Sequence, residues 1–151
     1  MRRLNLLAAF ALVTLLACEQ KPEPKTPIQL TEAKIDSLET VFFGKSENSG
    51  DFKTGMALVR EYAKYYQHGS KDSLAIDRLF KAGEVSMGIH QGNLAVNYFR
   101  IVSEEHPTFY KAPEALFLSG FCSENLLADT ANAKTFYEKF MVMYPGHHLA
   151  Q

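Results

Sequence analysis

Few residues in this 151-residue chain combine a reactive type with a spacing that supports chemistry. Five histidines and two cysteines are present, but none lies in an H-E-x-x-H or C-x-x-C pattern, so no motif has the ligand spacing of a metal site. Cys122 has no histidine next to it in the sequence, and we expect a buried, unreactive thiol. The adjacent carboxylates of Glu104 and Glu105 point apart on a helix. The sequence therefore predicts no enzyme activity, no metal and no cofactor.

Composition and charge exclude a further class of partner. The chain has 16 Lys and Arg against 17 Asp and Glu, so no basic excess is available to hold a nucleic-acid backbone. The sequence is 46% hydrophobic and 22% charged, which is typical of one globular domain. We therefore expect a folded protein that does not bind nucleic acid.

The first 17 residues have the composition of a secretory signal. Two arginines precede an apolar run over residues 4–17, which as a helix spans about 21 Å and falls short of the ~30 Å core of a bilayer. Leu15-Leu16-Ala17-Cys18 resembles the lipobox of bacterial lipoproteins, which implies that Cys18 receives a diacylglycerol and becomes the first mature residue. The alternative is a conventional signal peptide cleaved near Ala17, with Cys18 left as an ordinary thiol.

A lipidated Cys18 implies membrane anchoring, because two or three acyl chains hold a protein durably where one chain binds only marginally. Residues 18–30 carry three prolines among charged residues, which predicts a flexible tether. Glu19 is not the Asp that resembles an inner-membrane retention signal in enteric bacteria. We therefore expect the protein in the bacterial cell envelope, at the outer membrane and facing the periplasm.

From residue 31 onward, apolar residues recur at helical spacing rather than in strand alternation. The spacing predicts an all-α domain over residues 31–151, with the first helix capped by Thr31. We expect three antiparallel helix pairs. Their approximate ranges are 31–68, 72–107 and 112–145.

The helix pairs repeat along the chain. The pattern L-F-x-x-G at residues 79–83 recurs 37 residues later at 116–120, and a shift of 38 relates the helices that follow. A weaker copy, 36 residues before Ala95, starts at Val59 and aligns Tyr62 with Tyr98. Stacked pairs bury the apolar face that one pair cannot cover, which predicts a short α-solenoid. The residues expected to pack its repeats are Gly83, Ala95, Tyr98, Phe99, Gly120, Ala133, Phe136 and Tyr137.

Residues 91–107 resemble the tetratricopeptide repeat most closely, because Ala95 is followed by an aromatic pair and then, twelve residues on, by Pro107. Gly83 and Ala95 are also twelve residues apart, as the two small positions of that family are. Residues 115–145 are similar to the envelope versions of the repeat, found in the barrel-assembly lipoprotein and in the periplasmic coordinator of the Tol–Pal system.

The resemblance implies that protein or peptide partners bind a concave face built by the first helix of each pair. Transferring the groove positions of the family to this chain gives Asp77, Phe80, Glu84, Met87, Glu114, Phe117, Phe121 and Glu124. These residues mix acidic and apolar side chains, which predicts a ligand segment with Lys or Arg and an apolar anchor. In the competing interpretation, Phe80 and Phe117 belong to the core.

Two classes of function stay open at this point. The first is a non-enzymatic envelope scaffold or adaptor that binds proteins through its repeats. The alternative is a structural subunit that self-assembles into a homo-oligomer through its uncapped C-terminal helix, because solenoids usually end in a polar capping helix and this sequence has none after Pro145. A natural chain that continues with further repeats would also cover that helix.

Overall fold

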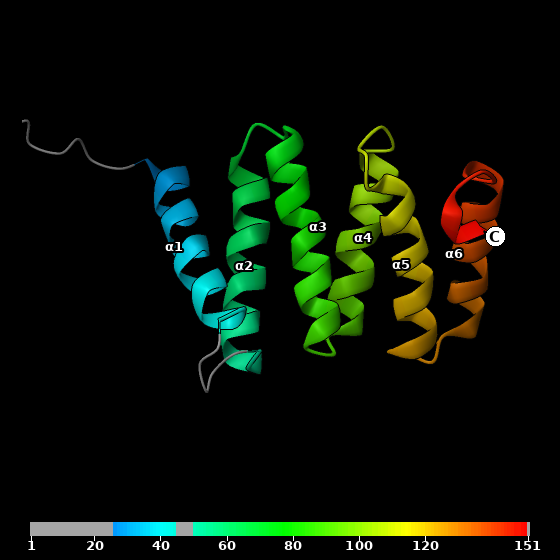
Figure 1. Ribbon diagram of the computed structural model, residues 1–151, viewed down its shortest axis with the longest axis horizontal. Helices are drawn as coiled ribbons and strands as arrows, with labels where there is room; N and C mark the ends of the chain where they lie inside the picture. The colour runs from blue at the N-terminus through cyan, green and yellow to red at the C-terminus, as the bar shows by residue number, and fades with distance from the viewer. Residues whose placement is uncertain (1–25, 45–49, 151) are drawn as a thin grey trace, which may run out of the picture.

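The computed structural model describes residues 26–44 and 50–150, and this part of the chain contains six α-helices and no strand. They lie side by side in one row, and each packs mainly on its neighbours in the sequence (Figure 1). The all-α fold and the short solenoid are thus confirmed. The expected signal at 1–17 and the expected lipid site Cys18 lie outside the described residues. The elements are α1 (Pro27–Phe42), α2 (Phe52–His68), α3 (Ser73–Gly88), α4 (Gly92–Glu105), α5 (Ala112–Asn125), α6 (Thr130–Met143) and the 3-10 turn η1 (His148–Ala150).

Helix α1 begins earlier than the sequence analysis expects. Thr26 caps it: its hydroxyl accepts a hydrogen bond from the Gln29 N–H at 3.3 Å, and the Gln29 side chain accepts one from the Thr26 N–H at 2.9 Å. Pro27 fits the first turn, where a backbone N–H has no helical partner. Thr31 is buried inside the helix and donates to the Pro27 carbonyl at 2.9 Å. The cap at Thr31 is therefore wrong, and the last four residues of the tether expected at 18–30 are helical.

Glycines let the helices of the second and third pairs approach closely. A Cβ built on Gly83 of α3 would lie 2.6 Å from the Phe99 ring of α4, and one on Gly120 of α5 would lie 2.7 Å from the Tyr137 ring of α6. Both distances are shorter than real Cβ contacts allow. The same pairing of a glycine with an aromatic ring thus occurs twice along the row.

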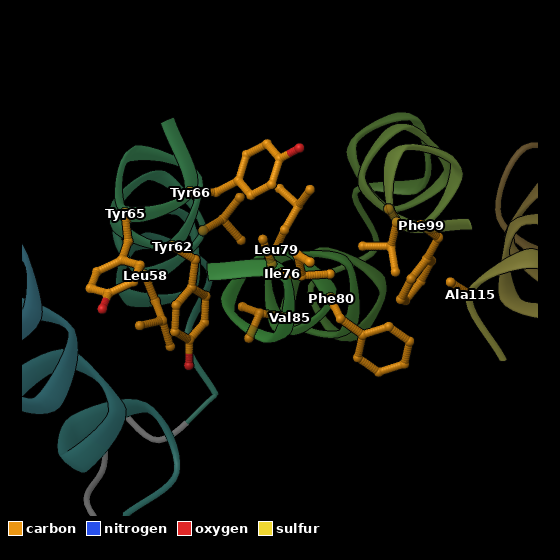
Figure 2. Packing of buried hydrophobic residues seen from close by; sticks show 14 of the residues in the cluster. Leu58, Tyr62, Tyr65, Tyr66, Ile76, Leu79, Phe80, Val85, Phe99 and Ala115 are labelled. Carbon is orange, nitrogen blue, oxygen red and sulfur yellow. The ribbon is translucent and has the colours of Figure 1, made fainter. Parts of the chain in front are cut away.

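The other residues expected to pack the repeats are buried or partly buried on α4 and α6. Ala95 and Ala133 are buried on α4 and α6, where their small side chains allow close contact. Tyr98 and Phe136 are partly buried. Phe99 is fully buried, and its ring lies 5.3 Å from that of Phe80 (Figure 2). At the α3–α4 interface, Gly83 and Phe80 of α3 thus both face the Phe99 ring of α4.

The first helix pair follows the same packing, but with a spacing of 37 rather than 36 residues. Leu58 and Tyr62 are fully buried, as are Ala95 and Phe99, which come 37 residues later. Ala63, which a spacing of 36 places opposite Phe99, is only partly buried. The predicted register is therefore wrong by one residue, because it matched tyrosine with tyrosine rather than buried face with buried face.

A second pair of glycines supports this register. Gly55 and Gly92 lie 37 residues apart near the starts of α2 and α4, and both are buried. A Cβ on Gly55 would lie 2.7 Å from Ile89, and a Cβ on Gly92 would lie 2.7 Å from Leu127 and 2.9 Å from Leu126. The apolar residues at the C-terminal end of α3 thus pack against Gly55, and those at the C-terminal end of α5 pack against Gly92. These contacts fix the stacking of successive units.

Candidate functional site

A hollow of about 400 Å³ opens between the C-terminal ends of α1 and α3. These two helices run in the same direction (Figure 1). Phe43, the C-cap residue of α1, is 64% exposed at its edge, with its ring 5.0 Å from that of Phe42. Gly88 in the last turn of α3 leaves open space, since a Cβ built there meets no atom within 4 Å. The hollow is lined by Phe42, Phe43, Lys81, Glu84, Val85 and Gly88.

The cation on the rim of the hollow, Lys81, shares one carboxylate with Arg78. Lys81 donates to the Glu39 carboxylate at 3.3 Å, and Arg78 donates to the same oxygen at 2.8 Å. The Tyr62 hydroxyl also donates to Glu39. Burial alone would raise the pKa of Glu39, but the hydrogen bond from Tyr62 and the charges of Lys81 and Arg78 together lower it. Glu39 therefore stays ionised and holds Lys81 toward α1.

The negative charge on the rim, Glu84, is not compensated in this way. Within residues 26–44 and 50–150, its side chain makes no hydrogen bond and no ion pair within 4 Å. The nearby cation Lys111 is bound to Asp77 at 2.9 Å. Burial raises the pKa of Glu84, the charge of Lys111 opposes this shift, and the neighbouring carboxylates of Asp77 and Glu114 add to it. Glu84 is thus an exposed carboxylate that makes no ion pair among the described residues, although the charges of Lys111 and Lys81 act on it.

The structure moves two of the predicted groove residues into helix packing. Phe80 is only 2% exposed, so its assignment to a partner-binding groove is wrong and the core interpretation holds (Figure 2). Phe117 is partly buried, with its ring 5.6 Å from those of Tyr137 and Phe140 of α6. These rings fill the interfaces between helices because an aromatic side chain at this position faces the following helix.

Three of the predicted groove residues have internal contacts that reduce their availability. Asp77 accepts hydrogen bonds from Lys111 and from the Tyr110 hydroxyl at 3.3 Å. Glu124 accepts one from the Tyr137 hydroxyl at 3.0 Å. Met87 is partly buried and packs against the core. These side chains therefore have less capacity left for a partner.

The remaining three, Glu84, Glu114 and Phe121, lie on α3 and α5, and we call this set the acidic strip. Phe121 is exposed and lies 37 residues after Glu84, at the equivalent position of its helix. Glu114 makes no hydrogen bond and no ion pair among the described residues. The strip and the hollow together offer acidic and apolar surface.

The α1 side of the hollow, with Phe43 at its edge, was missed by sequence reasoning. A signal was present, because Phe42 and Phe43 are adjacent on a helix and successive side chains point about 100° apart, so both cannot enter one core. Gly88 was also missed, because the absence of a side chain leaves no motif.

Comparison of the chain with family models, with curated proteins and with solved structures finds no match. Over residues 26–44 and 50–150, no helix has the length and apolar character needed to cross a bilayer. The same residues contain no group of three or more His, Cys, Asp or Glu side chains that could hold a metal. Burial raises the pKa of the Cys122 thiol to about 11, which keeps it protonated.

Proposed function

We propose that this protein is a lipid-anchored scaffold of the bacterial envelope, a tetratricopeptide-like adaptor that binds segments of other proteins on the face formed by α1, α3 and α5. The observation that carries the proposal is the open hollow beside Glu84, an exposed carboxylate that makes no ion pair within the described part of the chain. Apolar hollows at a surface mark binding sites. A partner that fills the hollow and brings a cation to Glu84 would bury apolar surface and form an ion pair.

The row of helices supports the same role. Helices α1, α3 and α5 alternate with α2, α4 and α6 along the row (Figure 1). Glu114 and Phe121 both lie on α5. An elongated face of this kind offers a partner several separate contacts, and solenoids commonly bind extended segments in this way. The acidic strip supplies charge and apolar area for binding rather than a nucleophile with an adjacent base.

The anchoring part of the proposal rests on Leu15-Leu16-Ala17-Cys18 and the apolar run before it. Lipidation at Cys18 would place the helical row at the outer membrane, facing the periplasm. Growth with radioactive palmitate tests this: the wild-type chain should take up label and a Cys18→Ser chain should not. Equal label in both, or none in either, would contradict it.

The adaptor role is tested by crosslinking in cells, purification of the protein and identification of the crosslinked proteins by mass spectrometry. We expect a set of partners with the wild-type chain that is lost with Glu84→Lys. The matched control is Glu105→Lys, which reverses an exposed carboxylate on α4 away from the hollow and should retain the same partners. Identical partners from Glu84→Lys and wild type would refute the role of this face.

One observation favours a second function, that of a self-assembling structural subunit. Met141, Val142 and Met143 are all exposed in the last turn of α6, with Val142 81% exposed. His147 covers part of that end, its ring 5.6 Å from the ring of Phe140. Sedimentation over a range of protein concentrations separates the two functions. The sedimenting mass of a self-assembling subunit increases with concentration, whereas that of an adaptor stays at the mass of the monomer.

A further inference from the structure

The hollow is large enough for one large side chain and far too small for a folded domain. Its volume of about 400 Å³ lies at the lower end of the range of ~300–1,000 Å³ typical of small-ligand sites. Phe43 and Val85 supply apolar wall, and Gly88 leaves the mouth open. An extended segment can place one aromatic or aliphatic side chain in such a space while its backbone stays outside.

The charges at the mouth of the hollow determine which residue of the partner segment can lie next to that side chain. Lys81 shares the Glu39 carboxylate with Arg78. Glu84 makes no ion pair with any described residue, and Glu114 lies close enough to raise its pKa. Three cations (Arg78, Lys81 and Lys111) therefore face four carboxylates (Glu39, Asp77, Glu84 and Glu114) around the mouth. The resulting net charge of −1 attracts lysine or arginine and repels the carboxylate of a fatty acid or the phosphate of an anionic lipid.

We infer that the hollow between α1 and α3 receives a single large apolar side chain of an extended partner segment, and that Glu84 binds a lysine or arginine next to that side chain. This inference rests on the proposed adaptor function and names the chemistry of its ligand. The occupant is a peptide segment of a protein partner. A lipid chain is the competing occupant, and the test below separates the two.

Gly88 provides a variant that places a side chain in the mouth of the hollow and leaves the helices in place. A leucine there would extend into open space, because even the first carbon of its side chain meets no atom within 4 Å, and leucine favours a helix more than glycine does. Gly146→Leu is the matched control, since a Cβ on Gly146 also meets nothing within 4 Å and this residue does not line the hollow. Circular dichroism should show the same helix content in both.

The test uses an array of decapeptides of glycine and serine that contain one phenylalanine, leucine or methionine and one lysine, arginine or glutamate at varied separations. The probe protein is the whole chain with Cys18→Ser. We expect binding to the peptides with lysine or arginine, at least tenfold weaker binding to those with glutamate, and loss of binding with Gly88→Leu but not with Gly146→Leu. Glu84→Lys should reverse the charge preference.

Three results would overturn the inference. They are equal binding by Gly88→Leu and the wild-type chain, an unchanged charge preference in Glu84→Lys, and no binding to any peptide on the array. Binding to vesicles of phosphatidylethanolamine and phosphatidylglycerol that Gly88→Leu abolishes, without peptide binding, would assign the hollow to lipid instead. If Gly88→Leu still captures the same partners in cells, the adaptor function stands and only the role of the hollow is refuted. If the wild-type chain captures no partner in cells, the adaptor function itself is refuted.

Discussion

Replacement of Gly83 with alanine should destabilise the protein, although the same change stabilises most helices. Alanine favours the helix by about 1 kcal/mol. Its Cβ, however, would lie 2.6, 2.8 and 2.9 Å from three carbons of the Phe99 ring. Phe99 is fully buried, so the ring has no solvent to move into. Overpacking costs about 1–3 kcal/mol, and three contacts below 3.0 Å place this case in the upper half of the range, at about 2–3 kcal/mol. After the helix gain is subtracted, a net loss of ~1–2 kcal/mol remains in the free energy of unfolding.

Urea unfolding followed by circular dichroism measures this difference, because a shift in the midpoint at constant slope reports stability. Gly88→Ala is the matched control on the same helix. It meets no atom within 4 Å and should raise the free energy of unfolding by a few tenths of a kcal/mol up to ~1 kcal/mol. Relative to the wild-type chain, Gly83→Ala should lower the free energy of unfolding and Gly88→Ala should raise it, so the two variants should differ by about 2 kcal/mol.

A double variant identifies the cause. In a Phe99→Leu background the ring is absent, so Gly83→Ala should no longer destabilise the protein, and the coupling between the two changes should exceed ~1 kcal/mol. Stability equal to or above wild type for Gly83→Ala alone, or the same loss with and without the Phe99 ring, would refute the claim that close contact at this glycine sets the spacing of α3 and α4.

Three further predictions concern polar groups. Glu39→Ala should lower the free energy of unfolding by about 1–3 kcal/mol at pH 7, because it leaves the Arg78 side chain, only 12% exposed, without its carboxylate. A urea unfolding midpoint equal to that of the wild-type chain would count against the ion pair. Burial lowers the pKa of His106, whose ring forms a hydrogen bond with the Tyr66 hydroxyl at 2.7 Å, so the fold favours the neutral ring and loses stability as the pH falls below ~6.5. His106→Gln should therefore flatten the decline of the unfolding temperature between pH 7 and pH 5. A decline as steep as that of the wild-type chain would show that other groups cause it. Burial raises the pKa of Cys122 to about 11, so in the Cys18→Ser chain this thiol should react with an aromatic disulfide reagent at pH 8 only after unfolding. Prompt reaction of the folded chain would mean that the thiol is accessible.

Sequence reasoning predicted the row of helices because two of its signals are local. Apolar residues at helical spacing mark each buried face, and the spacing of Gly83 and Gly120 marks the repeat. The start of α1 was missed because Pro27 looks like a helix breaker, although a proline is favoured in the first turn. The register of the first pair was wrong because Tyr62 and Tyr98 share a residue type but not a degree of burial.

The candidate site was predicted only in part, because it depends on how two helices meet. Glu84 and Glu114 were found by their position in the repeat. Phe80 satisfied the same rule, but its ring enters the core, a difference that only the packing on Phe99 decides. Phe43 was missed because α1 departs from the repeat, so no spacing related its end to α3.

The measurement that tests the central claim most directly is photo-crosslinking in living cells from a benzoylphenylalanine that replaces Phe43 at the edge of the hollow. The same group at Glu105 on α4 and at Val142 on α6 provides the comparison, since both positions are exposed and neither lines the hollow. Our account predicts adducts with other envelope proteins from position 43 that are absent at position 105 and vanish in Gly88→Leu. Adducts confined to position 142 and consisting only of a second copy of this chain would contradict it and establish the self-assembling subunit instead.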